Sequence, residues 1–172
     1  MNEIPKPPQD QSDSETESSV FLAHARRADQ LAVMEDIASR DICFMCPEHI
    51  PEFYEQKDGL IHEGEYSYLV DNGYPYTNTR LHIMAIPKEH IRDLSEISNE
   101  FWIEALGYFQ QLEQQRGVTG GVVAMRFGNP AETGATARHL HVHFIVPELN
   151  ADFDEDGPLV FYMSPGPSHT PK

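Results

Sequence analysis

The chain has 172 residues, of which 40% are hydrophobic, and its formal net charge at pH 7 is −16. This length can bury the core of one domain, and the acidic charge argues against duplex nucleic acid as a partner. There is no apolar run of about 18 residues and no apolar signal segment at the N-terminus, so we expect a cytoplasmic protein without a membrane-spanning helix.

Both ends of the chain have the composition of solvated segments. Residues 1–19 combine prolines, serines and acids with almost no apolar side chains, which predicts a disordered acidic tail. Residues 151–172 are acidic and then rich in proline and serine, with one short apolar stretch at 159–163. A single domain is therefore predicted over residues 20–150.

The predicted elements of this domain follow in chain order. Apolar residues recur at near-helical spacing over residues 20–40, which predicts an N-terminal helix. Ser98 is a suitable N-cap for a long amphipathic helix that ends near residue 115. Five segments alternate or run apolar between turn residues, which predicts strands. They cover residues 59–63, 66–70, 81–86, 121–127 and 140–146. This order predicts an α+β fold, an antiparallel sheet of about five strands with the long helix packed on it.

Three histidines, His139, His141 and His143, alternate with apolar residues in the segment Arg138-His-Leu-His-Val-His-Phe-Ile-Val-Pro147. In a strand, successive side chains point to opposite faces, so the imidazoles would share one face while the apolar side chains face the core. Two other interpretations stay open. The segment could be a surface strand that holds histidines by chance, or the three imidazoles could bind a metal.

The alternating histidines resemble the signature of the histidine triad (HIT) superfamily of nucleotidyl hydrolases and transferases. Two upstream segments extend the resemblance over residues 41–147. Ile83-Met-Ala-Ile-Pro-Lys-Glu-His90 is similar to the strand and Pro-Lys turn of the family, with Leu81 in place of the usual glycine before His82. Asn129-Pro-Ala-Glu-Thr-Gly-Ala-Thr136 is similar to the family's phosphate-binding loop, with Ala135 in place of glutamine and about one residue fewer.

The resemblance implies a HIT-like fold, a two-fold dimer and nucleotidyl transfer. His141 would attack the α-phosphorus of a nucleotide and form a nucleotidyl-histidine intermediate, because a neutral imidazole is a competent nucleophile near pH 7. Its other ring nitrogen would donate to a backbone carbonyl of the triad segment. His143 would bind the phosphoryl oxygens, and Thr136 with the backbone N–H groups from Gly134 onward would stabilise the transition state.

Further nucleotide contacts are implied by the resemblance. Asn129 would contact the phosphate or the leaving group, and Asp71 or Asn72 would hold the ribose hydroxyls. His82 is assigned to the same nucleotide-binding site. For Asn129, Thr136 and the Asp71–Asn72 pair, ordinary turn or cap chemistry remains an alternative.

The two cysteines, Cys43 and Cys46, belong to one Cys-Phe-Met-Cys unit. A structural disulfide is not expected in a reducing compartment, which leaves a metal site, a redox pair or reduced core residues. The resemblance to zinc-containing HIT proteins implies a structural zinc site formed by Cys43, Cys46, His90 and His139. His49 is a rival ligand, because Cys-x-x-Cys-x-x-His is also workable spacing.

The sequence leaves the reaction open between two subtypes. Asn72-Gly-Tyr-Pro-Tyr76, together with the cysteine pair, resembles the bacterial diadenosine-polyphosphate phosphorylase branch, which favours a dinucleoside polyphosphate hydrolase or phosphorylase. The alternative is a nucleoside phosphoramidate hydrolase. Rivals from other classes are a non-catalytic nucleotide-binding HIT protein and a metal-dependent hydrolase.

Overall fold

The computed structural model describes residues 18–149 and 158–160 of the chain. Most of the two predicted tails, 1–19 and 151–172, lies outside the described residues. Within the described part, no helix has the length and apolar character that crossing a membrane requires.

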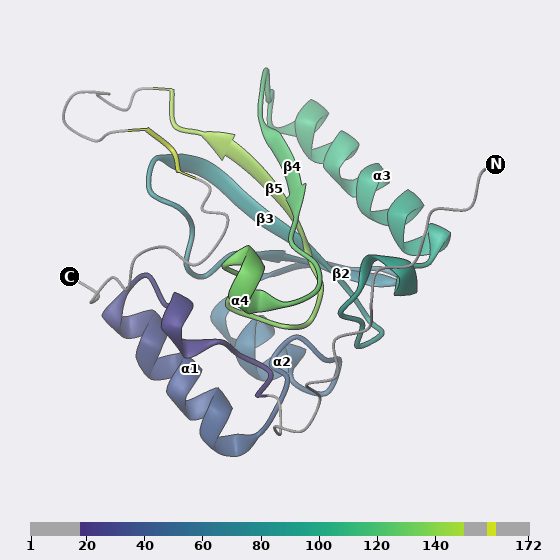
Figure 1. Cartoon of the computed structure of the whole chain (residues 1–172). Coiled ribbons are helices and arrows are strands. Elements are labelled where there is room, and N and C mark those ends of the chain that lie inside the picture. Colours follow the sequence, from purple (N-terminus) through teal and green to yellow (C-terminus); the bar gives the residue numbers. More distant parts are fainter. Residues whose placement is uncertain (1–17, 150–157, 161–172) are drawn as a thin grey trace, which may run out of the picture.

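An antiparallel sheet of five strands forms the centre of the domain, as the sequence predicts (Figure 1). Its spatial order is β1-β2-β3-β5-β4, so β3 is central and pairs with β2 on one side and β5 on the other. The strands are β1 (Leu60–Glu63), β2 (Ser67–Asp71), β3 (Thr79–Pro87), β4 (Val122–Met125) and β5 (Val142–Pro147). The last strand begins two residues later than predicted, so His139 and His141 lie in the segment immediately before it.

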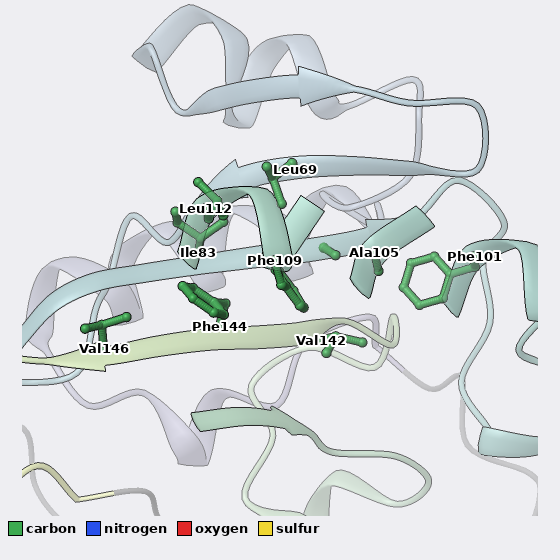
Figure 2. Close-up of a cluster of buried hydrophobic side chains, with 10 residues drawn as sticks. Leu69, Ile83, Phe101, Ala105, Phe109, Leu112, Val142, Phe144 and Val146 are labelled. Carbon is green, nitrogen blue, oxygen red and sulfur yellow. The ribbon is translucent and has the colours of Figure 1, made fainter. Parts of the chain in front are cut away.

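The long helix α3 (Asn99–Gln115) packs on one face of the sheet (Figure 1). Ser98 caps it as predicted, because its side chain accepts a hydrogen bond from the backbone N–H of Phe101 at 3.1 Å. Phe109 of this helix stacks on Phe144 of β5 with ring centroids 5.2 Å apart, and Figure 2 shows the two rings together within the buried cluster. Alternation along β5 places Val142, Phe144 and Val146 on this face, so His143 points to the opposite one.

The opposite face of the sheet is covered by the N-terminal half of the domain. Here α2 (Ile50–Phe53) contributes Ile50 to a second apolar cluster with Met84 and Ile86 of β3. The remaining short elements are the helix α4 (Pro130–Thr133) and the 3-10 turns η1 (Leu22–His24), η2 (Glu55–Lys57) and η3 (Leu94–Glu96).

The predicted helix over residues 20–40 is wrong in its first third. Helix α1 spans only Ala28–Arg40. Residues 18–27 instead lie alongside the loop after α4, where Val20 forms an isolated β-bridge with Ala137. Backbone bonds from Phe21 N–H to the Thr136 carbonyl (2.9 Å) and from Arg138 N–H to the Ser19 carbonyl (3.0 Å) hold the two segments together. These pairings use backbone groups that a helix would need, and Figure 1 shows the segment beside α4.

Candidate functional site

A cavity of about 1030 Å³ opens on the histidine face of the sheet. His141 and His143 form part of its wall, together with the loop from Gly134 to Thr136. Other lining residues come from the segment 20–37 and from residues 71–77. His141 and His143 therefore face a space large enough for a nucleotide-sized ligand.

His141 presents one defined ring nitrogen to this cavity. Its Nδ1–H donates to the backbone carbonyl of His139 at 2.9 Å, which leaves Nε2 as the nitrogen with a lone pair. The side chain is only 8% exposed, and burial lowers its pKa to about 4. The ring is thus neutral near pH 7, and its proton lies on Nδ1, as the resemblance to the histidine triad superfamily implies.

His143 is oriented by a buried neighbour, His82 of β3. The backbone N–H of Tyr76 donates to His82 Nδ1 at 3.2 Å, so the proton of the neutral ring lies on Nε2. That nitrogen lies 3.0 Å from His143 Nδ1 and donates to it, which places the remaining proton of His143 on its Nε2. Burial lowers the pKa of His82 to about 3 and that of His143 well below its usual value.

His82 itself does not line the cavity. It is 4% exposed and lies behind His143, against the Tyr76 ring at 4.7 Å between centroids. The nucleotide contact assigned to His82 from the sequence stays a prediction, and the contact that the structure shows is with His143.

The predicted phosphate contacts around α4 fall into two groups, those that line the cavity and one that does not. Gly134 and Thr136 line the cavity, and Gly134 adopts φ 72°, a left-handed conformation that favours glycine. Asn129 does not line it. Its Oδ1 accepts from the Ala131 N–H at 3.0 Å and its Nδ2 donates to Glu132 at 3.3 Å, so this side chain caps α4. The structure therefore shows Asn129 as the N-cap of α4, the alternative to a phosphate contact.

Asp71 and Asn72 both line the cavity at the end of β2. Asn72 forms a turn with its own backbone, because its Oδ1 accepts from the Tyr74 N–H at 2.9 Å, and its Nδ2 lies 3.0 Å from His82 Nε2. Burial raises the pKa of the Asp71 carboxyl. Of this pair, Asp71 has the more exposed side chain, and its carboxylate is available to a ligand.

Cys43, Cys46, His90 and His139 come together on the far side of the triad segment. One possible ligand atom from each lies within 4.8 Å of all the others. The sulfur of Cys46 is 3.2 Å from His90 Nδ1, and the sulfur of Cys43 is 3.4 Å from His139 Nδ1. A tetrahedral zinc site with Zn–S near 2.3 Å and Zn–N near 2.0 Å separates sulfur from nitrogen by about 3.5 Å, so these residues fit the metal.

The surroundings of His139 leave one of its ring nitrogens available to a metal ion. His139 is fully buried, and its Nε2–H donates to the Pro87 carbonyl at 3.0 Å, which leaves Nδ1 available toward the cysteines. Burial lowers the pKa of His139 to about 3 and raises that of Cys46 to about 12. The rival ligand His49 is not in the cluster; its backbone N–H donates to the Cys46 carbonyl.

Several cavity residues carried no signal in the sequence. His24, Arg26 and Gln30 line the cavity from the N-terminal segment and α1. His24 Nδ1 donates to the Ala135 carbonyl at 2.9 Å, and the Arg26 guanidinium lies 4.3 Å above the Tyr76 ring. No sequence motif surrounds His24. Its place at the site depends on a contact between segments 111 residues apart.

Two arginines, Arg26 and Arg126, contribute positive charge near His141 and His143. Arg126 lines the cavity, and its charge helps to lower the pKa values of His141 and His143, after burial. Arg26 acts on His143 in the same way. Of the other cations near the motifs, Lys88 pairs with Glu63 at 2.9 Å, and Arg138 donates to the Ser18 carbonyl at 2.8 Å. The cavity thus offers local positive charge in a strongly acidic chain.

Comparisons with known proteins agree with this geometry. The profile of the family described as "Scavenger mRNA decapping enzyme C-term binding" matches residues 46–156. A search of the curated proteins found no match.

Among solved structures, a HIT family hydrolase from Clostridium thermocellum is 23% identical, with 54% of this chain and 82% of that chain covered and a TM-score of 0.44. A zinc-bound histidine triad family protein from Mycobacterium smegmatis is 26% identical, with coverages of 62% and 73% and a TM-score of 0.43. A histidine triad protein from Clostridium difficile is 19% identical, with coverages of 55% and 83% and a TM-score of 0.43.

The matched range contains His141 and His143 and covers more than half of the chain. The chain therefore belongs to the scavenger mRNA decapping enzyme C-term binding family, within the histidine triad superfamily.

Proposed function

We propose that the protein transfers the nucleoside monophosphate part of a nucleotide substrate to His141, and from there to water or phosphate. The observation that carries the proposal is the hydrogen bond from His141 Nδ1 to the His139 carbonyl, in a ring that lines the cavity. This bond directs the Nε2 lone pair to the ligand space. In the first step Nε2 bonds to the α-phosphorus and the bond to the leaving group breaks. In the second, an oxygen nucleophile displaces His141.

The groups around His141 are suited to the charge that develops on the phosphoryl oxygens. His143 Nε2–H donates to one of these oxygens, and the His82 contact of 3.0 Å fixes the ring for that purpose. Thr136 and the N–H groups from Gly134 onward act from the loop, while Arg126 supplies positive charge. Asp71 binds the ribose hydroxyls.

The Cys43, Cys46, His90 and His139 cluster holds a structural zinc ion in this proposal. Bound zinc supplies a cross-link between the Cys-x-x-Cys loop and the triad segment, and all four protein ligands are used, which is typical of a structural rather than a catalytic site. Because the backbone carbonyl of His139 also accepts the hydrogen bond from His141 Nδ1–H, the cluster supports the nucleophile's position.

The proposal is tested by intact-protein mass spectrometry during turnover of a substrate panel. The panel contains diadenosine tetraphosphate, a capped dinucleotide suggested by the family description, and adenosine phosphoramidate. We expect a nucleotidyl adduct that is lost in His141→Ala and retained in His62→Ala, an exposed histidine of β1. Turnover by His141→Ala, or no adduct and no turnover by the wild type, would contradict it.

A second measurement separates the reaction subtypes. Diadenosine tetraphosphate is incubated with and without inorganic phosphate, and the products are separated by chromatography. ADP forms only if phosphate displaces His141, whereas hydrolysis gives AMP and ATP. Preferential turnover of the phosphoramidate would instead assign the phosphoramidate hydrolase subtype.

Assembly into a two-fold dimer is part of the proposal. The edge strand β4 exposes Val122 and Val123, at 52% and 48% of their surface, and α3 exposes Ile103 and Leu106 at 74% and 45%. A second copy joined at β4 would continue the sheet and cover these apolar side chains. The molar mass in solution tests this, and a monomer would contradict it.

A further inference from the structure

Gln30 is a polar residue at a position of α1 where an apolar one is expected. Gln30, Met34 and Ile37 are the buried residues of this helix, and their spacing places them on one face. Gln30 is only 5% exposed. Burial of an amide is unfavourable unless its polar atoms are hydrogen-bonded, so both ends of this side chain require a partner.

One end of the Gln30 amide has a partner in the protein. Its Oε1 accepts from the backbone N–H of Arg26 at 2.9 Å. A backbone N–H can only donate, which fixes the oxygen at this end and the NH₂ group at the other. Across residues 18–149 and 158–160, no acceptor for Nε2 is present. The side chain therefore offers a donor to whatever fills the adjacent space.

The adjacent space is the cavity of the triad. Gln30 lines it together with apolar and aromatic side chains, among them Val33, Met34, Phe44 and Phe53. Apolar walls with one directed polar group suit a flat ring that carries an acceptor on its edge. His141 and His143, the phosphate-directed groups, line the same cavity.

We propose that Gln30 determines base specificity by donating from Nε2 to an acceptor atom on the edge of the nucleobase. This inference rests on the proposed function, because it requires a nucleotide in the cavity. Gln30 lies in α1, outside the range matched by the family profile, residues 46–156. This part of the site is therefore not covered by the profile.

The test is the affinity of AMP, GMP, IMP, CMP and UMP, measured by titration calorimetry on the full chain, for which no turnover is needed. Gln30→Glu is the informative variant, because its carboxylate still accepts from Arg26 N–H but has no donor to offer. Its added charge acts on every monophosphate alike, so the ratios between bases report the lost donor. Val33→Ala, which removes apolar wall at the same cavity, is the matched control.

We expect the base that the wild type prefers to lose about tenfold in affinity relative to the others in Gln30→Glu, the size of one lost hydrogen bond. Val33→Ala should weaken all five monophosphates by a similar factor. Ratios preserved within about twofold in Gln30→Glu would overturn the role of Gln30 while leaving nucleotide binding intact. Failure of the wild type to bind any of the five would overturn both this inference and the proposed function.

Discussion

Mild acid is expected to destabilise the fold through the buried pair His82 and His143. Burial lowers the pKa of His82 to about 3 and that of His143 well below its usual value, so both stay neutral in the folded protein near pH 5. The same side chains in the unfolded chain have a pKa near 6.5 and bind protons there. Because the unfolded state binds more protons, the free energy of unfolding falls as the pH drops below about 6.5.

The size of this effect follows from the two states of each ring. A histidine that remains neutral when folded loses about 2 kcal/mol between pH 7 and pH 5, from RT ln(1 + 10^(6.5 − pH)). For the two rings together the loss is about 4 kcal/mol, against a total stability of about 5–15 kcal/mol for a typical domain. Urea unfolding at pH 7, 6 and 5 measures this loss together with that from His139 and His141, whose pKa values burial also lowers.

The variant His82→Asn isolates one ring of the pair. Its Oδ1 can still accept from the Tyr76 N–H, but it carries no titrating group. We expect lower stability than the wild type at pH 7, yet a loss between pH 7 and pH 5 that is smaller by about 2 kcal/mol. Asn72→Ala, which removes a contact of His82 without removing a titrating group, should keep the wild-type dependence. Parallel pH dependences for wild type and His82→Asn would refute the reasoning.

Three further predictions concern the metal cluster, the core and a helix cap. Cys46→Ser should lower both the zinc content, measured by plasma mass spectrometry, and Tm, because three ligands hold the ion less tightly; less than half an equivalent of zinc in the wild type would contradict the site. Phe109→Ala should lower the free energy of unfolding by about 3–5 kcal/mol, since it leaves a cavity beneath Phe144; a loss under about 1 kcal/mol in urea would count against this packing. Ser98→Ala should cost about 1 kcal/mol by removing the acceptor for Phe101 N–H, and unchanged stability would show that the cap is dispensable.

The elements that the sequence predicts correctly are those with local signals. Ser98 and the apolar spacing that follows it define α3, and period-two alternation places His141 and His143 opposite the face that packs on α3. The four members of the metal cluster also have local signals, namely the cysteine spacing, the Pro-Lys turn and the triad, although only the resemblance joins them into one site.

The features that the sequence does not predict depend on contacts between distant segments. Residues 20–27 have near-helical apolar spacing, but pairing with the loop at 136–138 replaces the helix. The same pairing brings Arg26 to the cavity, and no sequence pattern around Arg26 predicts this position. His82 has a motif, yet only the packing of β3 beside β5 shows that it contacts His143 instead of lining the cavity.

The pairing of the N-terminal segment with the loop after α4 also bears on the order of folding. Contacts between His24 and Ala135 and between Arg138 and Ser18 join residues 111 and 120 positions apart. Closing such long loops is entropically unfavourable until intervening elements have formed, so the β1–β2 and β2–β3 pairings are expected to precede them. During synthesis, the ligand-binding wall can close only after residue 138 has left the ribosome. Closure of the cavity is then expected among the last events of folding, together with the addition of β5 to the sheet.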